Sequence, residues 1–192
     1  MDTATFWHMI ETAKAESKGN CEQQAQLLQQ HLTLLPPEEI SSFDRLLWVF
    51  WDEAYSRQLW AAAYLMNGAF SDEGFDSFRG WLIAQGEAGF RAALQGPDTL
   101  ADAIEPLEAP QVGPLGPYGC EEMLYVAWPA FEAKADQEMP QDDQPSSDLV
   151  GEAWEEDADA EEENPWADGD LSEQYARKHL PKLWAKFGWG DL

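Results

Sequence analysis

The sequence lacks the features by which zinc proteins and disulfide-rich secreted proteins are usually recognised. Only two cysteines occur, Cys21 and Cys120, and neither belongs to a CxxC pair or has a histidine nearby. This pattern indicates neither a zinc site nor a disulfide framework, so we expect reduced thiols in a cytosolic protein. The first residues contain no basic region followed by an apolar run, which argues against a secretory signal.

Motifs for the common catalytic chemistries are also missing. The three histidines form no HxxxH or HExxH arrangement, and the sequence contains no GxSxG turn, GxGxxG loop or Walker loop. The acidic strings at 157–161 and 168–170 lack the spacing of an EF-hand loop. We therefore expect no cofactor and no metal site. These absences count against an enzyme but do not exclude one, because a carboxylate pair can catalyse without a motif.

Basic residues and long apolar runs are scarce. The chain has 11 Lys and Arg against 37 Asp and Glu, which gives a formal net charge of −26. Sixteen of the acidic residues and none of the basic ones lie between Lys134 and Arg177. No run approaches the ~20 apolar residues that cross a bilayer. Such a charge repels nucleic acid and anionic membranes, so we expect the protein to bind neither and its partner to be a basic protein. Because the sequence shows neither a secretory signal nor a membrane-spanning run, we expect a cytoplasmic protein.

Apolar and aromatic residues, by contrast, are plentiful and recur at helical spacing. Hydrophobic residues make up 44% of the chain, and alternating β-branched runs are absent. We predict an all-α fold: a single compact multi-helix domain of about seven to eight helices. The expected elements are helices at 2–18, 20–34 and 37–50, a core element at 48–67, helices at 71–86 and 87–95, a turn capped by Asp98 that runs to 104, and a helix from 121 that Pro129 kinks or divides.

Composition divides the chain into three parts. Residues 1–134 form the predicted helical domain, although the stretch 105–119 is rich in proline and glycine and reads as a loop. Residues 135–170 are acidic and poor in aliphatic side chains, as in flexible, partly disordered segments. Two tryptophans in that segment, Trp154 and Trp166, could pin it to the folded body or to a partner. Residues 171–192 are predicted to form an amphipathic helix that packs back on the domain.

Long stretches of the chain resemble a known protein family. The resemblance is carried by WAAAYLMNG at 60–68 and SDEGFDSFRGWLIAQG at 71–86, and it extends to Phe6-Trp7, LPPEE at 35–39, Val126-Ala127 with Phe131, and LWAKFG at 183–188. In these segments the sequence is similar to a bacterial domain of unknown function, the family numbered 4240. The family pattern tends to read Ala-Ala where this chain has Trp128-Pro129, which predicts a bend there. The resemblance implies a bacterial cytosolic helical protein and carries no activity to transfer.

One group of residues resembles a binding site. Asp72, Asp76 and Arg79 share one face of the predicted helix at 71–86. The preceding helix can bring Trp60, Tyr64 and Asn67 to the same place. Two carboxylates and an arginine beside aromatic rings could hold a cationic or guanidino ligand, or act as acid and base on a small molecule. The structural alternative is an ion pair under the Ser71 cap, with Arg79 stacked on Trp81 or a neighbouring ring.

Two functional hypotheses follow. The first is an acidic interaction module that binds a basic protein and, in a narrower form of the hypothesis, inhibits it. Residues 135–170 then act either as a polyanionic attractant or as a solubilising tether. The second is a small-molecule enzyme or sensor at Asp72, Asp76 and Arg79. Charge and tryptophan content favour the first hypothesis.

Overall fold

A computed structural model of the chain describes residues 1–68, 71–104, 117–135, 137–140, 166–167 and 170–188. Over these ranges the fold is all-α, as predicted, and contains ten α-helices, two short 3-10 helices and one pair of two-residue antiparallel strands. No helix in the described ranges has the length and apolar character needed to cross a membrane. Most of the predicted acidic segment, including Trp154, lies outside the described residues.

The elements follow one another in a simple order. They are α1 (Thr3–Ser17), α2 (Cys21–Thr33), α3 (Pro37–Glu53), α4 (Arg57–Asn67), α5 (Asp72–Ala84), α6 (Glu87–Gln95), η1 (Pro97–Thr99), α7 (Leu100–Ala103), η2 (Glu121–Tyr125), α8 (Ala127–Ala135), β1 (Trp166–Ala167), β2 (Asp170–Leu171), α10 (Glu173–His179) and α11 (Pro181–Phe187).

Several helices begin where local chemistry predicts. The side chain of Asn20 accepts a hydrogen bond from the amide of Gln23 at the start of α2, and Ser71 accepts one from Gly74 at the start of α5. Pro37 occupies the first position of α3, where its missing N–H removes no helical hydrogen bond. These boundaries confirm the predicted starts of three helices.

Three predicted elements differ from those in the structure. The element expected at 48–67 is the end of α3 followed by α4, because Ser56 caps a new helix by accepting from the amide of Leu59. The expected C-terminal helix is divided into α10 and α11 at Pro181. Pro129 lies in the first turn of α8, where proline is tolerated, so the break falls before it, between η2 and α8.

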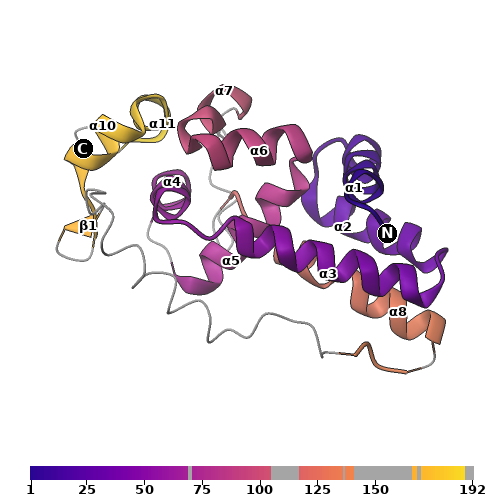
Figure 1. Cartoon of the computed structure of the whole chain (residues 1–192). Helices are drawn as coiled ribbons and strands as arrows, with labels where there is room; N and C mark the ends of the chain where they lie inside the picture. Colours follow the sequence, from indigo (N-terminus) through magenta and orange to yellow (C-terminus); the bar gives the residue numbers. More distant parts are fainter. Residues whose placement is uncertain (69–70, 105–116, 136, 141–165, 168–169, 189–192) are drawn as a thin grey trace.

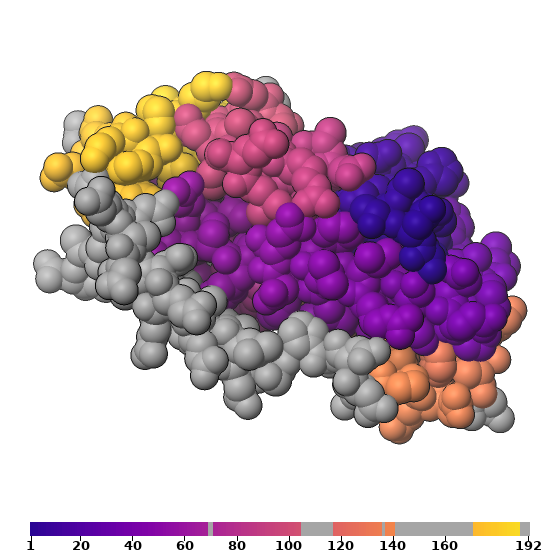
Figure 2. Space-filling model, viewed as in Figure 1, coloured from indigo at the N-terminus to yellow at the C-terminus, as the bar shows by residue number. Residues whose placement is uncertain are grey.

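Helix α5 lies at the centre of the described fold. Ten of its 13 residues are buried, and it contacts α1, α2, α3, α4, α6 and η2. In Figure 1, α3 crosses the middle of the molecule with α8 against it, α1 and α2 lie at one end, and α4, α10 and α11 lie toward the other. The space-filling view shows the C-terminal helices, in yellow, packed against the segment that contains α6 and α7 (Figure 2).

An unexpected contact holds α11 in place. Asp98 was predicted to cap the short helix that follows it, but α7 has no side-chain cap. The Asp98 carboxylate instead accepts hydrogen bonds from the backbone amides of Lys182, at 2.9 Å, and Leu183, at 2.9 Å. These amides belong to the first turn of α11, which has no cap of its own. A carboxylate from a distant segment therefore satisfies the helix start.

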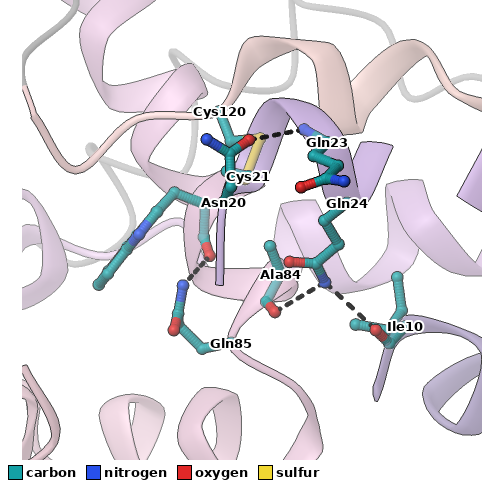
Figure 3. Close-up of a disulfide and its surroundings, with 9 residues drawn as sticks. Ile10, Asn20, Cys21, Gln23, Gln24, Ala84, Gln85 and Cys120 are labelled. Carbon is teal, nitrogen blue, oxygen red and sulfur yellow. Dashed lines mark hydrogen bonds between the residues drawn. A yellow bond between two sulfur atoms is a disulfide. The ribbon is translucent and has the colours of Figure 1, made fainter. Parts of the chain in front are cut away.

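The prediction of two reduced cysteines is wrong in this structure. Cys21, the first residue of α2, and Cys120, which precedes η2, form a disulfide across 99 positions of sequence. Figure 3 shows the bond beside Gln24, whose buried amide donates to the carbonyl oxygens of Ile10 and Ala84. The spacing of two cysteines carries no record of which helices pack together, so the pair was invisible in the sequence.

The backbone at Cys120 lies close against α5, which positions Cys120 for the disulfide. The amide of Cys120 donates to the carbonyl oxygen of Ser77 on α5 at 2.9 Å. A Cβ added at Gly80 would lie 2.5 Å from the carbonyl oxygen of Cys120, too close for any other residue without a backbone shift. The absence of a side chain at Gly80 thus lets the segment before η2 rest on α5, where Cys120 meets α2.

The disulfide is expected to stabilise the fold strongly. In the chain-entropy description, a closed loop of ~100 residues lowers the entropy of the unfolded chain by an amount worth about 4–5 kcal/mol at 25 °C. The double variant Cys21→Ser, Cys120→Ser should lose stability of this order in chemical denaturation, compared with the oxidised protein. Adding a reductant should destabilise the original protein and leave the double variant unchanged. Two titratable thiols in the folded, unreduced protein would contradict the assignment.

Candidate functional site

Arg79 is the central residue of the predicted site, and it is completely buried. It lies in the middle of α5 with none of its surface exposed. Its guanidinium carbon lies 3.3 Å from the ring centroid of Trp51, 4.9 Å from that of Tyr55 and 5.0 Å from that of Phe75. The structural alternative placed Arg79 on Trp81 or a neighbouring ring, and the stacking ring is Trp51 at the end of α3. Aromatic faces stabilise a cation that has lost its water.

Arg79 makes two polar contacts through its terminal nitrogens, while its Nε atom has no hydrogen-bond partner among the described residues. One terminal nitrogen donates to Asp76 Oδ1 at 2.5 Å, and the other donates to the carbonyl oxygen of Trp51 at 3.0 Å. Trp51 lies in the last turn of α3, which contains no basic residue, so the guanidinium supplies the positive charge that the C-terminal end of a helix favours. Burial lowers the pKa of Arg79, and the bond to Asp76 opposes that shift.

The structure brings only some of the predicted site residues together. Asp76 pairs with Arg79, and Trp60 packs at a tilt against Phe75, one of the rings that surround the guanidinium, with ring centroids 4.4 Å apart. Tyr64 is half-buried on α4. Asn67 faces elsewhere: its Oδ1 accepts from the backbone amide of Tyr118 at 2.9 Å.

Asp72 also differs from its predicted place. It is exposed in the first turn of α5, where a carboxylate is favoured by the positive end of the helix dipole. The ion pair that the structure shows for Arg79 is the one with Asp76. The expected face of two carboxylates and an arginine is therefore one carboxylate joined to a buried cation.

A second buried charge, Asp44, was missed by the sequence interpretation. Asp44 lies on α3 with 6% of its surface exposed, between the buried residues Phe43 and Leu47. Two half-buried indoles lie near its carboxyl group, Trp48 one turn further along α3 and Trp128 on α8. A carboxylate within an apolar stripe was the available signal, because acidic residues are rarely buried without a reason.

Burial dominates the chemistry of Asp44 and raises its pKa from 3.8 to about 6. Hydrogen bonding from Trp48 and Trp128, and the charge of Arg45, act in the opposite direction. Oδ1 of Asp44 and the Nε1 atoms of both tryptophans nevertheless lack a partner of full hydrogen-bond geometry within the described ranges. The two indoles therefore stabilise the charged form only weakly, and Asp44 can change its charge near neutral pH.

The described residues contain no group of three or more His, Cys, Asp or Glu side chains arranged to hold a metal ion. Asp76 is paired with Arg79 and Asp72 is exposed, so the two carboxylates are not arranged as an acid and a base. What the arrangement can do is hold α3 and α5 together through one buried cation.

Arg79 is expected to contribute mainly to stability. Arg79→Met keeps much of the side-chain volume but removes the bonds to Asp76 and to the Trp51 carbonyl, so we expect a loss of about 2–4 kcal/mol in chemical denaturation. Arg91→Met is a suitable control, because the Arg91 ion pair with Glu53 is partly exposed and should contribute less than about 1 kcal/mol. An Arg79→Met protein of unchanged stability that had lost a ligand would instead support the small-molecule hypothesis.

Asp44 is expected to make stability depend on pH in an unusual direction for a carboxylate. Its pKa is higher in the folded protein, so its proton stabilises the fold below about pH 4, and this contribution is lost as pH rises through about 6. We therefore compare the free energy of unfolding of Asp44→Asn with that of the original protein at two pH values. The difference should favour the variant by about 3 kcal/mol more at pH 8 than at pH 4. Asp52→Asn, on an exposed position of the same helix, is the control. Equal effects of Asp44→Asn at both pH values would contradict the assignment.

Comparisons with known proteins give a family but no activity. A family model described as a protein of unknown function (DUF4240) matches residues 1–133, which include every element from α1 to η2 and most of α8. The similarity noted at 183–188 lies outside that range. No curated protein and no solved structure matches the chain. The chain belongs to the DUF4240 family, whose function its name leaves open.

Proposed function

We propose that this protein is an acidic helical interaction module that binds a basic protein. In a narrower form of the proposal, binding also inhibits that protein. The observation that carries the proposal is the charge of −26, which comes from 37 acidic and 11 basic residues. Many of the basic residues are engaged within the chain: Arg79 with Asp76, Arg91 with Glu53, Arg177 with Glu173, and Lys182 with Asp102. The acidic excess therefore remains to act on a partner.

The uneven distribution of this charge supports a role in association. The stretch between Lys134 and Arg177 has sixteen acidic residues and no basic ones. A high local charge of one sign accelerates encounter with a partner of the opposite sign and disfavours nucleic acid and anionic membrane. We propose that this stretch attracts the basic partner and that the helical body, residues 1–134, provides the contacts that retain it.

The small-molecule hypothesis at Asp72, Asp76 and Arg79 stays a prediction, and the geometry does not favour it. The guanidinium is enclosed by aromatic rings and already binds Asp76 and the Trp51 carbonyl. A ligand would have to displace one of these contacts to reach it.

The proposed cytoplasmic location rests on the sequence. The Cys21–Cys120 disulfide bears on it, because disulfides persist mainly in oxidising compartments. The redox state of these two cysteines in the cell therefore tests the proposed location.

Association with a basic partner should depend steeply on salt. The full chain and a variant without residues 136–168 can be immobilised and exposed to native lysate at about 0.05 M and about 0.3 M salt, which brackets the range where exposed charges become screened. We expect the full chain to retain a basic protein best at low salt. The deletion should slow association and leave weaker, less salt-sensitive binding, because charges act mainly on the association rate.

A length-matched control separates charge from chain length. Replacing the acidic residues of 136–168 with Asn and Gln should have the same effect as the deletion. Circular dichroism checks that both variants remain helical. If neither the full chain nor the variants specifically retain a basic protein at either salt concentration, the proposal is wrong.

A further inference from the structure

A groove lies beside the disulfide, on a part of the surface that the predicted site does not include. One wall is α2, and the other consists of η2 and the start of α8. Its volume is about 300 Å³. This volume lies at the low end for ligand sites, enough for a single large side chain rather than an extended molecule. Its lining includes Glu22, Gln26 and Gln29 from α2, and Glu122, Tyr125 and Pro129 from the opposite wall.

Tyr125 gives the groove an exposed aromatic surface. It is 42% exposed, one of three large hydrophobic residues of the described ranges with such exposure. Its ring meets Trp128 edge to face, with centroids 5.5 Å apart, which fixes the orientation of the ring at the end of η2. An exposed, oriented aromatic ring on a concave surface is typical of the anchor points of protein interfaces.

The charges at the groove are all of one sign. Glu22 and Glu122 contribute a carboxylate from each wall, and none of the lining residues is basic. Burial raises the pKa of the Tyr125 hydroxyl group, and the negative charges of Glu121 and Asp76 add to that shift. A cation entering the groove would therefore meet an aromatic face together with a carboxylate on each of the two walls.

The disulfide fixes the distance between the two walls. Glu22 follows Cys21 directly in α2, and Glu122 is two residues beyond Cys120 in η2. Because the bond joins the two segments at this point, the backbone positions of Glu22 and Glu122 are held on opposite walls of the groove before a partner arrives. Preorganisation of this kind lowers the ordering cost of binding.

We propose that this groove binds an arginine side chain of the basic partner, an inference that rests on the proposed function. Arginine fits better than lysine because its planar guanidinium can stack on the Tyr125 ring while its N–H groups donate to carboxylates and amide oxygens. Gln26 and Gln29 provide amide oxygens on the α2 wall. A lysine ammonium, as a strongly hydrated point charge, would respond to the acidic charge with little preference for the groove.

Two peptides of equal charge test the inference on the full chain. One alternates glycine and arginine, and the other alternates glycine and lysine. At about 0.15 M salt, where long-range attraction is largely screened, isothermal titration should show that the arginine peptide binds several-fold more tightly. Tyr125→Ala should weaken the arginine peptide by about 3–10-fold, leave the lysine peptide nearly unchanged and so remove the preference. Tyr125→Phe should keep it, because the ring is retained.

Variants that remove one negative charge provide an independent test of arginine binding in the groove. Glu122→Gln should weaken the arginine peptide several-fold, whereas Glu87→Gln on α6, which removes one charge away from the groove, should change both peptides slightly and equally. Reduction of the disulfide, verified by thiol titration, should also lower the preference for arginine. Circular dichroism of each variant excludes a general loss of structure.

The outcomes separate this inference from the proposed function. If the full chain binds both peptides equally well, or if Tyr125→Ala and Glu122→Gln keep the arginine preference, the groove is not the site, while the interaction module stands. If the full chain binds neither the peptides nor a basic protein from lysate, both proposals fail.

Discussion

The buried guanidinium of Arg79 is the interaction on which the rest of the described fold depends. Moving a cation from water into a protein interior costs several kcal/mol, so it is tolerated only with close compensation. Here the compensation comes from two helices at once: Asp76 on α5 itself, and the Trp51 ring and carbonyl at the end of α3. Because the carbonyl belongs to the last turn of α3, satisfying the cation also fixes where that helix ends against α5. Two of the residues that look most like a binding site in the sequence, Asp76 and Arg79, thus help to join the two central helices.

The same principle recurs at other helix ends. Lys14 of α1 donates to the carbonyl oxygen of Gln85, just after α5, Lys186 of α11 donates to that of Ala101 in α7, and Asp98 accepts from the first amides of α11. Each contact places a charge where the helix dipole favours it. These contacts and the ion pairs occupy much of the small supply of basic side chains within the fold. Because these cations are engaged within the fold, the acidic residues dominate the electrostatic potential outside it.

These charged contacts also explain which parts of the structure could be predicted. Asn20 and Ser71 act on amides three residues away, so local sequence contains the whole interaction, and the all-α class follows from such signals together with helical periodicity. The Ser56 cap is equally local, but it was not predicted because the apolar residues continue across it. Asp98 and Cys21 act on segments more than 80 positions away, and only the packed fold reveals their partners. Asp44 is an intermediate case: its place in an apolar stripe was visible, whereas the two indoles beside it come from different helices.

Charge and groove would perform different parts of recognition. A field from many exposed carboxylates extends only about 10 Å at ordinary salt and carries little information about the shape of a partner. It raises the rate of encounter but cannot distinguish one basic protein from another. Selection requires a contact in which geometry matters, such as an oriented ring in a groove that carries a carboxylate on each wall. The Cys21–Cys120 bond and the packing of Trp128 on Tyr125 supply that rigidity at the groove. A protein with only the acidic charge would bind basic surfaces indiscriminately, and the groove supplies a structural basis for choosing among them.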